Sequence, residues 1–150
     1  MTTASSETVV QTYLDVPSQP KLVLPANSCD SHVHVFGPRS RFPYAAARKN
    51  TPAEAPKEKL FALHKKLGIA RCVIVQSITH GTDNSVVEDA IEAGGGHYLG
   101  VALTEVDVSD AELKRLASRG FRAVRFHFMK HIGGGHDVND VIKLTPRLAE

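Results

Sequence analysis

The sequence has no tryptophan, and only 6% of its 150 residues are aromatic. No apolar stretch approaches the roughly 20 residues that a membrane-spanning helix needs. The net charge is only +2, and basic clusters interleaved with aromatic residues, which are typical of nucleic-acid-binding proteins, are absent. The first 25 residues lack the basic start and continuous apolar core of a signal peptide. We therefore expect a cytoplasmic protein that binds neither membranes nor nucleic acids.

Cysteine is scarce as well, since Cys29 and Cys72 are the only two. If Gln76 faces the site predicted below, the two thiols point to opposite faces of their strands, which argues against a disulfide between them. The hydrophobic share of 42% is enough for one globular core. We expect residues 1–27 to form an N-terminal arm or flap and residues 28–150 to form the folded unit.

A βα unit repeats beyond the arm. A capping-box spacing at Ser85–Glu88, or a cap at Asp83 or Asn84, begins the second helix, and Ser109–Glu112 begins the third. Strands that alternate with helices along the chain predict an α/β fold with a parallel sheet. The expected strands and helices, in chain order, are strand 28–36, helix 56–67, strand 70–76, helix 85–93, strand 98–103, helix 110–119 and strand 121–129.

The last residues suggest a longer protein. Thr145-Pro146 has the pattern of a helix start, a capping hydroxyl followed by proline at the first helical position. A (β/α)8 barrel has eight βα units and typically about 250 residues, and this chain supplies about four units. We expect residues 28–150 to be the N-terminal half of such a barrel, and the alternative is a short α/β protein.

The segment Asp30-Ser-His32-Val-His34 lies in the first predicted strand. Residues two apart on a strand point to the same face, so both imidazoles can converge on a metal or polarise a carbonyl. Asp30 has the same parity and could orient one imidazole. Two histidines do not complete a zinc site. A pair of hydrogen-bonded core histidines is the alternative.

Other candidate site residues follow later strands. Arg125 and His127 share one face of the fourth strand, where the arginine needs either a core acid or an anionic substrate. Gln76 and His80 end the second strand and could bind substrate or close a loop.

The remaining histidines divide into two groups. His131 and His136 follow the fourth strand and belong to the predicted active end, where the strands of α/β folds place their chemistry. His64 lies in a helix and His97 precedes a strand, so we expect both on the surface.

These residues resemble the amidohydrolase superfamily, in which a His-x-His closes the first strand of a (β/α)8 TIM barrel. The nearer resemblance is to the branch of 2-pyrone-4,6-dicarboxylate lactonase. The segments that carry it are Asp30-Ser-His-Val-His-Val-Phe-Gly-Pro38, Arg41-Phe-Pro43, Leu60-Phe-Ala-Leu63, Leu67-Gly-Ile-Ala-Arg71, Val73-Ile-Val-Gln76, His80-Gly-Thr-Asp-Asn84 and Gly120-Phe-Arg-Ala-Val-Arg-Phe126.

The resemblance implies hydrolysis of a small anionic lactone in the breakdown of aromatic compounds. His32 and His34 would polarise the lactone carbonyl, either without metal or as zinc ligands, and Arg125 would hold an acid group. The third histidine and the aspartate that activates water belong to later strands of the family's barrel. The remaining residues that we expect to bind substrate are His127, His131, Gln76 and His80.

Three positions depart from the pyrone lactonase pattern. His131 stands where that branch has a second arginine, Asn50 replaces a tyrosine and Ile78 replaces a serine. The loss of one arginine and two hydroxyl donors favours a sister activity such as that of 4-sulfomuconolactone hydrolase. Two alternatives are a lactone isomerase or decarboxylase of the same superfamily and a catalytically incomplete fragment that acts as a binding or assembly unit.

Overall fold

The computed structural model describes residues 8–129 and 135–149. Its main sheet is parallel, and its spatial order β2-β4-β5-β6 follows the order along the chain. This confirms the predicted α/β class and the four expected strands, of which the first, the second and the fourth are shorter than expected. The strands are β2 (Cys29–Val33), β4 (Arg71–Val75), β5 (Tyr98–Leu103) and β6 (Phe121–Arg125).

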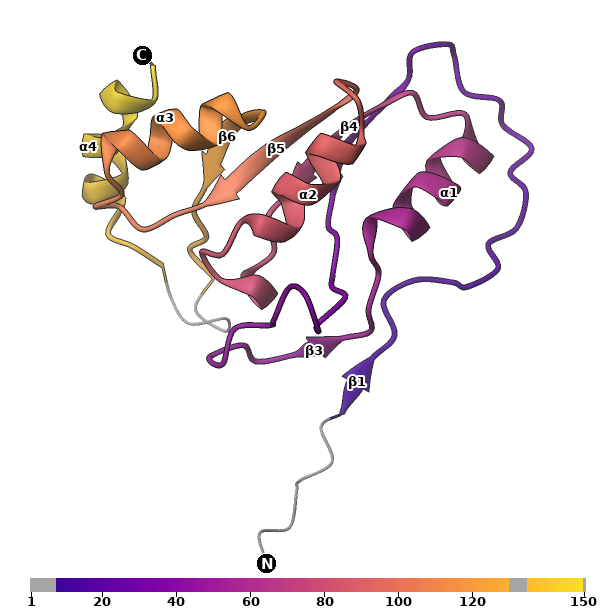
Figure 1. Cartoon of the computed structure of the whole chain (residues 1–150), viewed down its shortest axis with the longest axis horizontal. Coiled ribbons are helices and arrows are strands. Elements are labelled where there is room, and N and C mark those ends of the chain that lie inside the picture. Colours follow the sequence, from indigo (N-terminus) through magenta and orange to yellow (C-terminus); the bar gives the residue numbers. More distant parts are fainter. Residues whose placement is uncertain (1–7, 130–134, 150) are drawn as a thin grey trace, which may run out of the picture.

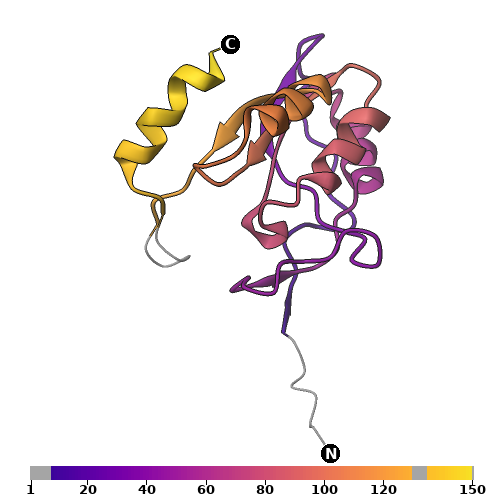
Figure 2. The ribbon, with the colours of Figure 1, turned by 60° about the vertical axis from the view of Figure 1, so that its left-hand side comes forward.

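Three helices connect the strands and lie on one face of the sheet (Figures 1 and 2). Apolar side chains of all three pack with the sheet in one buried core, which includes Leu60, Val87 and Leu116 from the helices and Ile74 and Ala102 from the strands. A fourth helix follows β6. The helices are α1 (Lys57–Leu67), α2 (Ser85–Ala93), α3 (Asp110–Ser118) and α4 (Val138–Leu148).

Local signals set most helix ends. The Ser109 hydroxyl accepts a hydrogen bond from the Glu112 backbone N–H at 3.2 Å, which confirms the predicted cap of α3. Gly68 ends α1 in the left-handed conformation at φ 73°. At α2 the cap is Asn84, whose side chain does not bond the helix; instead the Asp83 carboxylate accepts from the Ser85 N–H at 3.1 Å.

The predicted helix start at Thr145-Pro146 is wrong, because both residues lie inside the last turns of α4. The helix begins at Asp137, whose carboxylate accepts a hydrogen bond from the Asn139 N–H at 2.7 Å. Pro146 has no N–H for the carbonyl four residues earlier, that of Ile142. The Thr145 hydroxyl donates to that carbonyl at 2.7 Å and replaces the missing bond.

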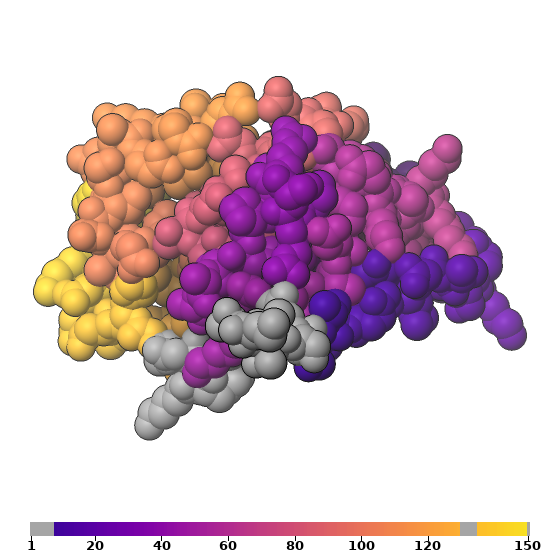
Figure 3. All heavy atoms as spheres, turned by 60° about the horizontal axis from the view of Figure 1, so that its bottom comes forward, coloured from indigo at the N-terminus to yellow at the C-terminus, as the bar shows by residue number. Residues whose placement is uncertain are grey.

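The described part of the N-terminal arm, residues 8–27, lies along the first loop and α1 (Figures 1 and 3). Its strand β1 (Val9–Val10) pairs in parallel with β3 (Thr51–Pro52) of that loop. The Tyr13 hydroxyl donates to the Glu54 carbonyl at 3.0 Å. Cys29 is exposed and Cys72 is buried, and both thiols are free, as expected. Every helix among the described residues is too short or too polar to span a membrane.

Candidate active site

The candidate site lies where the four parallel strands end and the first loop, residues 34–56, folds across them (Figure 1). His34 follows β2, and its Nδ1 lies 2.6 Å from the Val75 carbonyl oxygen. A carbonyl oxygen only accepts hydrogen bonds, so Nδ1 carries the proton and donates it. Burial lowers the pKa of His34, and the charges of Arg125 and His32 lower it further. The resulting neutral ring keeps a lone pair on Nε2.

His32 is exposed, and its ring centroid lies 5.2 Å from that of His34. Asp30 does not share its face, which corrects the parity argument. Asp30 is paired with Cys72 and Val33 with Ile74. Between these two pairs, β2 advances by three residues and β4 by only two. This bulge turns the Asp30 side chain into the helix layer, because one extra residue reverses the alternation of a strand.

Arg125 ends β6 opposite Leu103. Its Nη1 donates to the Gln76 carbonyl at 3.0 Å, and burial lowers its pKa. Among residues 8–129 and 135–149, no carboxylate lies within ion-pair distance of this guanidinium. The sequence left two possible partners for Arg125, a core acid or an anionic substrate. The described residues do not supply the acid.

Gln76 is fully buried and ties down the loop that follows β4. Its amide nitrogen donates to the carbonyls of Gly81 at 3.2 Å and Asp83 at 2.6 Å. Its Oε1 is buried with no partner among the described residues. The amide nitrogen thus closes a loop, and the expected contact of Gln76 with substrate stays a prediction.

His80 has structural contacts as well, and its expected contact with substrate stays a prediction. Its Nδ1 donates to the Pro43 carbonyl at 3.2 Å, while its Nε2 accepts from the Gly37 N–H at 3.4 Å. Its ring stacks on Phe36 and meets Tyr44 edge-on. Both ring nitrogens are occupied, and burial lowers the pKa of His80. The ring anchors the first loop to the end of β4.

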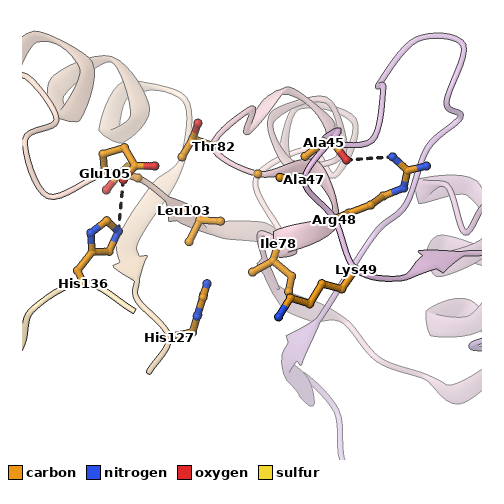
Figure 4. A pocket seen from close by; sticks show the side chains of 12 residues that line it. Ala45, Ala47, Arg48, Lys49, Ile78, Thr82, Leu103, Glu105, His127 and His136 are labelled. Carbon is orange, nitrogen blue, oxygen red and sulfur yellow. Dashed lines mark hydrogen bonds and ion pairs between the residues drawn. The ribbon is translucent and has the colours of Figure 1, made fainter. Parts of the chain in front are cut away.

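A cavity of about 310 Å³ opens between the first loop and the ends of β5 and β6 (Figure 4). His127 and Lys49 enter it from these two sides. His127 Nδ1 is buried with no partner among the described residues. His136 lines the cavity too, and its Nε2 lies 3.4 Å from a Glu105 carboxylate oxygen. His131, the other histidine predicted here, lies outside the described residues.

Sequence reasoning missed two kinds of lining residue. Thr104, only 5% exposed, directly follows β5, and its hydroxyl has no partner among the described residues. The position after a parallel strand was the available signal. Lys49 comes from the first loop. No periodic pattern in the sequence predicts that this loop folds over the strand ends.

His64 is not a surface residue, which corrects another expectation. It is 2% exposed, and its ring lies between Asp30 and Tyr98. His97 is exposed, as expected.

The described residues offer part of a metal site. The free Nε2 of His34 suits a metal ligand, since ligating histidines donate their other ring N–H to a carbonyl or carboxylate. His32 adds a second imidazole beside it. No group of three or more His, Cys, Asp or Glu side chains that could hold a metal occurs within residues 8–129 and 135–149. The pair supplies two of the three or four ligands that zinc requires.

A sequence profile for amidohydrolases matches residues 29–143, which include every strand of the main sheet. The chain belongs to the amidohydrolase family. Its four-stranded sheet with helices on one face is the corresponding part of the amidohydrolase (β/α)8 barrel, as the fold prediction stated.

Three similar proteins place the chain within the amidohydrolases. It is 43% identical over 134 residues to 2-pyrone-4,6-dicarboxylate hydrolase of Comamonas testosteroni, covering 89% of this chain and 44% of that protein. It is 41% identical over 115 residues to 4-sulfomuconolactone hydrolase of Hydrogenophaga intermedia, covering 77% and 38%. The crystal structure of a probable 2-pyrone-4,6-dicarboxylic acid hydrolase of Acinetobacter baumannii superimposes with a TM-score of 0.72 at 22% identity, covering 81% and 45%. The chain thus spans less than half the length of the curated relatives it matches.

Proposed function

We propose that this chain contributes the carbonyl-activating and anion-binding half of a lactone hydrolase that opens anionic lactones in aromatic catabolism. The observation that carries the proposal is Arg125, a half-buried guanidinium with no acid partner among the described residues, held beside the His32–His34 pair. A buried arginine without an acid is a ready anion site. Relatives at 43% and 41% identity are named as hydrolases of an anionic pyrone and a sulfonated lactone.

The position of the His34 proton indicates how the carbonyl is activated. With Nδ1–H committed to Val75, Nε2 presents a lone pair rather than a hydrogen-bond donor. A neutral Nε2 can bind a metal or take up a proton, but it cannot donate to a carbonyl oxygen. We therefore favour His34 and His32 as zinc ligands, where zinc would supply a Lewis acid for the lactone carbonyl. A metal-free mechanism requires His32, or a protonated His34, to donate instead.

Arg125 and the residues that line the cavity bind and orient the substrate in this proposal. The Gln76 carbonyl fixes one arm of Arg125, so the other guanidinium N–H groups are oriented to hold a carboxylate or sulfonate. Lys49, His127 and Thr104 line the neighbouring cavity of about 310 Å³. Holding the anion places the ring for attack at its carbonyl, and such positioning accounts for much of a hydrolase's rate enhancement.

The choice between the two lactones is a finer proposal. Ile78 lines the cavity where the pyrone lactonase pattern has a serine, which removes one hydroxyl donor for a carboxylate. We favour the sulfonated lactone, because this change, like those at Asn50 and His131, departs from the pattern of the dicarboxylate enzyme. An isomerase or decarboxylase of the same family, and a binding or assembly unit without turnover, are the alternatives. The cytoplasmic location remains a prediction from the sequence.

Steady-state hydrolysis of both lactones by the protein with a complete barrel, followed by ring-opening absorbance with and without added zinc, tests the proposal. We expect Arg125→Met to lower kcat/KM roughly 10- to 150-fold, as expected for the loss of a hydrogen bond to a charged group of about 1.5–3 kcal/mol. Arg122→Met is the matched control, because among the described residues Arg122 donates to the carbonyls of Ala117 and Phe121 only. Equal rates in the two variants would contradict the role of Arg125.

Two further measurements separate the alternatives. Incorporation of solvent ¹⁸O into the product acid marks hydrolysis, whereas an isomerase or decarboxylase leaves no such label. Absence of turnover of either lactone, with zinc supplied, would favour the binding or assembly unit.

A further inference from the structure

A polar chain crosses the helix layer on the face of the sheet away from the His32–His34 pair. The Tyr98 hydroxyl lies 2.8 Å from His64 Nδ1, and His64 Nε2 lies 3.3 Å from an Asp30 carboxylate oxygen. The other Asp30 oxygen accepts a hydrogen bond from the His32 backbone N–H at 3.1 Å. The chain thus joins β5, α1 and β2 and ends on the main chain of a candidate catalytic residue.

Each hydrogen bond of this polar chain can be given one donor and one acceptor without conflict. Burial raises the pKa of Tyr98, so its phenol stays protonated and can donate to His64 Nδ1. His64 Nε2–H then donates to Asp30, which accepts from both His64 and His32. Every polar atom named has a partner, and Tyr98 itself belongs to the apolar core between the helices and the sheet. A fully satisfied buried network of this kind favours one arrangement of its members over others.

That arrangement includes the bulge in β2. In a regular strand Asp30, His32 and His34 would share one face. The pairing of Asp30 with Cys72 and of Val33 with Ile74 shows that the strand gains one residue between positions 30 and 33. With His32 and His34 kept on the opposite face, Asp30 reaches His64 only in this bulged register, so each contact of Asp30 in the helix layer favours it over the regular one.

We propose that Asp30, His64 and Tyr98 are positioning residues, which hold the bulge of β2 and thereby fix the mutual orientation of His32 and His34. Asp30 acts at two points, through the His32 N–H and through its anchor on α1. His64 and Tyr98 act through Asp30 and do not approach the cavity at the strand ends. The proposal concerns the geometry of the pair and is independent of which lactone is hydrolysed.

NMR of the isotope-labelled protein tests this proposal without an activity assay. The first readout is hydrogen exchange of the His32 backbone amide, which a bond to Asp30 protects although the residue is exposed. The second is the nuclear Overhauser contact between the His32 and His34 rings, whose centroids lie 5.2 Å apart. Asp30→Ala removes the acceptor, His64→Leu removes the anchor, and Tyr98→Phe removes a single oxygen from the far end.

Two further variants make the test specific. In Asp30→Asn the side-chain oxygen still accepts from the His32 N–H. The side-chain amide nitrogen donates to His64 Nε2, so the ring takes its other tautomer and donates from Nδ1 to the Tyr98 oxygen. The hydrogen bonds of the polar chain are thus kept, with donors and acceptors exchanged at His64. Val87→Ala is the matched control, because Val87 is a fully buried residue of the same layer. It opens a cavity there but does not take part in the polar chain.

We expect Asp30→Ala to speed exchange of the His32 amide by roughly 10- to 100-fold relative to Val87→Ala, as expected for loss of a hydrogen bond to a charged group, and to abolish the ring contact. His64→Leu should weaken the contact, and Asp30→Asn should preserve it. Tyr98→Phe, a one-atom change, decides the matter if larger changes prevent folding, and it should raise His32 amide exchange measurably. Wild-type exchange and ring contact in Tyr98→Phe and His64→Leu, or equal changes in Val87→Ala, would overturn the proposal.

Discussion

Asn84 is expected to be the most damaging polar residue to replace outside the candidate site. It caps α2, but its side chain points to the neighbouring strand. Its Oδ1 accepts from the Leu103 N–H at 2.9 Å, and its Nδ2 donates to the Leu103 carbonyl at 3.0 Å and to the Thr82 carbonyl at 3.0 Å. The amide thus takes the place of a strand partner at the end of β5, just before Thr104.

The structure sets the size of the effect for Asn84→Ala. Both backbone groups of Leu103 lose their partner in these buried bonds, and an unsatisfied buried group costs about 1–3 kcal/mol. Asn84 is itself buried at 6% exposure, so water does not readily replace it. We expect a loss of about 2–4 kcal/mol in the free energy of unfolding, a large part of the 5–15 kcal/mol typical of a domain.

Urea denaturation followed by circular dichroism measures this loss. Asn84→Asp sharpens the test, because its carboxylate still accepts from the Leu103 N–H but faces the Leu103 carbonyl with a second oxygen. We expect it to be at least as destabilising as alanine. Asn139→Ala, on the exposed face of α4, should stay within about 0.5 kcal/mol of wild type. An Asn84→Ala loss as small as that of Asn139→Ala would refute the reasoning.

Two other predictions concern packing and pH. A Cβ at Gly100 would lie 2.6 Å from Phe121 Cδ1 and 2.7 Å from Ile91 Cδ1, so Gly100→Ala should cost about 1–3 kcal/mol by overpacking, and an unchanged thermal midpoint would contradict this. Burial lowers the pKa of both His34 and His80 below 6.5 in the folded chain, so the unfolded chain binds more protons and stability should fall as pH drops below about 6.5. Urea midpoints between pH 7.5 and 5 measure this slope, which His80→Asn should reduce, and a rise in stability on acidification would argue against it.

Much of the fold could be predicted from the sequence because its signals are local. The Ser109 cap, the glycine that ends α1 and the apolar strand 71–75 each depend on residues within a few positions of one another. The failure at Thr145-Pro146 has the same origin. A proline after threonine is a good helix start by local rules, but here the Thr145 hydroxyl compensates for the missing N–H and the helix passes through.

The candidate site was predictable only in part. Asp30 and His64 are 34 residues apart, and no periodic pattern marks the bulge that lets them meet. A histidine on a helix of lysines has the pattern of a surface residue, and its burial is made favourable by Tyr98 and Asp30 on distant strands. The partners of His80 could not be predicted for a similar reason, since they come from the first loop.

The chemistry of the His-x-His pair therefore depends on a group that the motif does not contain. The sequence identifies two imidazoles but not which nitrogen of each faces a ligand. For His34 the Val75 carbonyl decides, because it accepts the hydrogen bond from Nδ1–H and so leaves the lone pair on Nε2. A ring held in that tautomer suits a Lewis acid as its partner more than it suits a bare carbonyl oxygen. The same motif on a strand whose neighbour offered no carbonyl at this point would leave both tautomers open, and metal-free polarisation would then be the simpler mechanism.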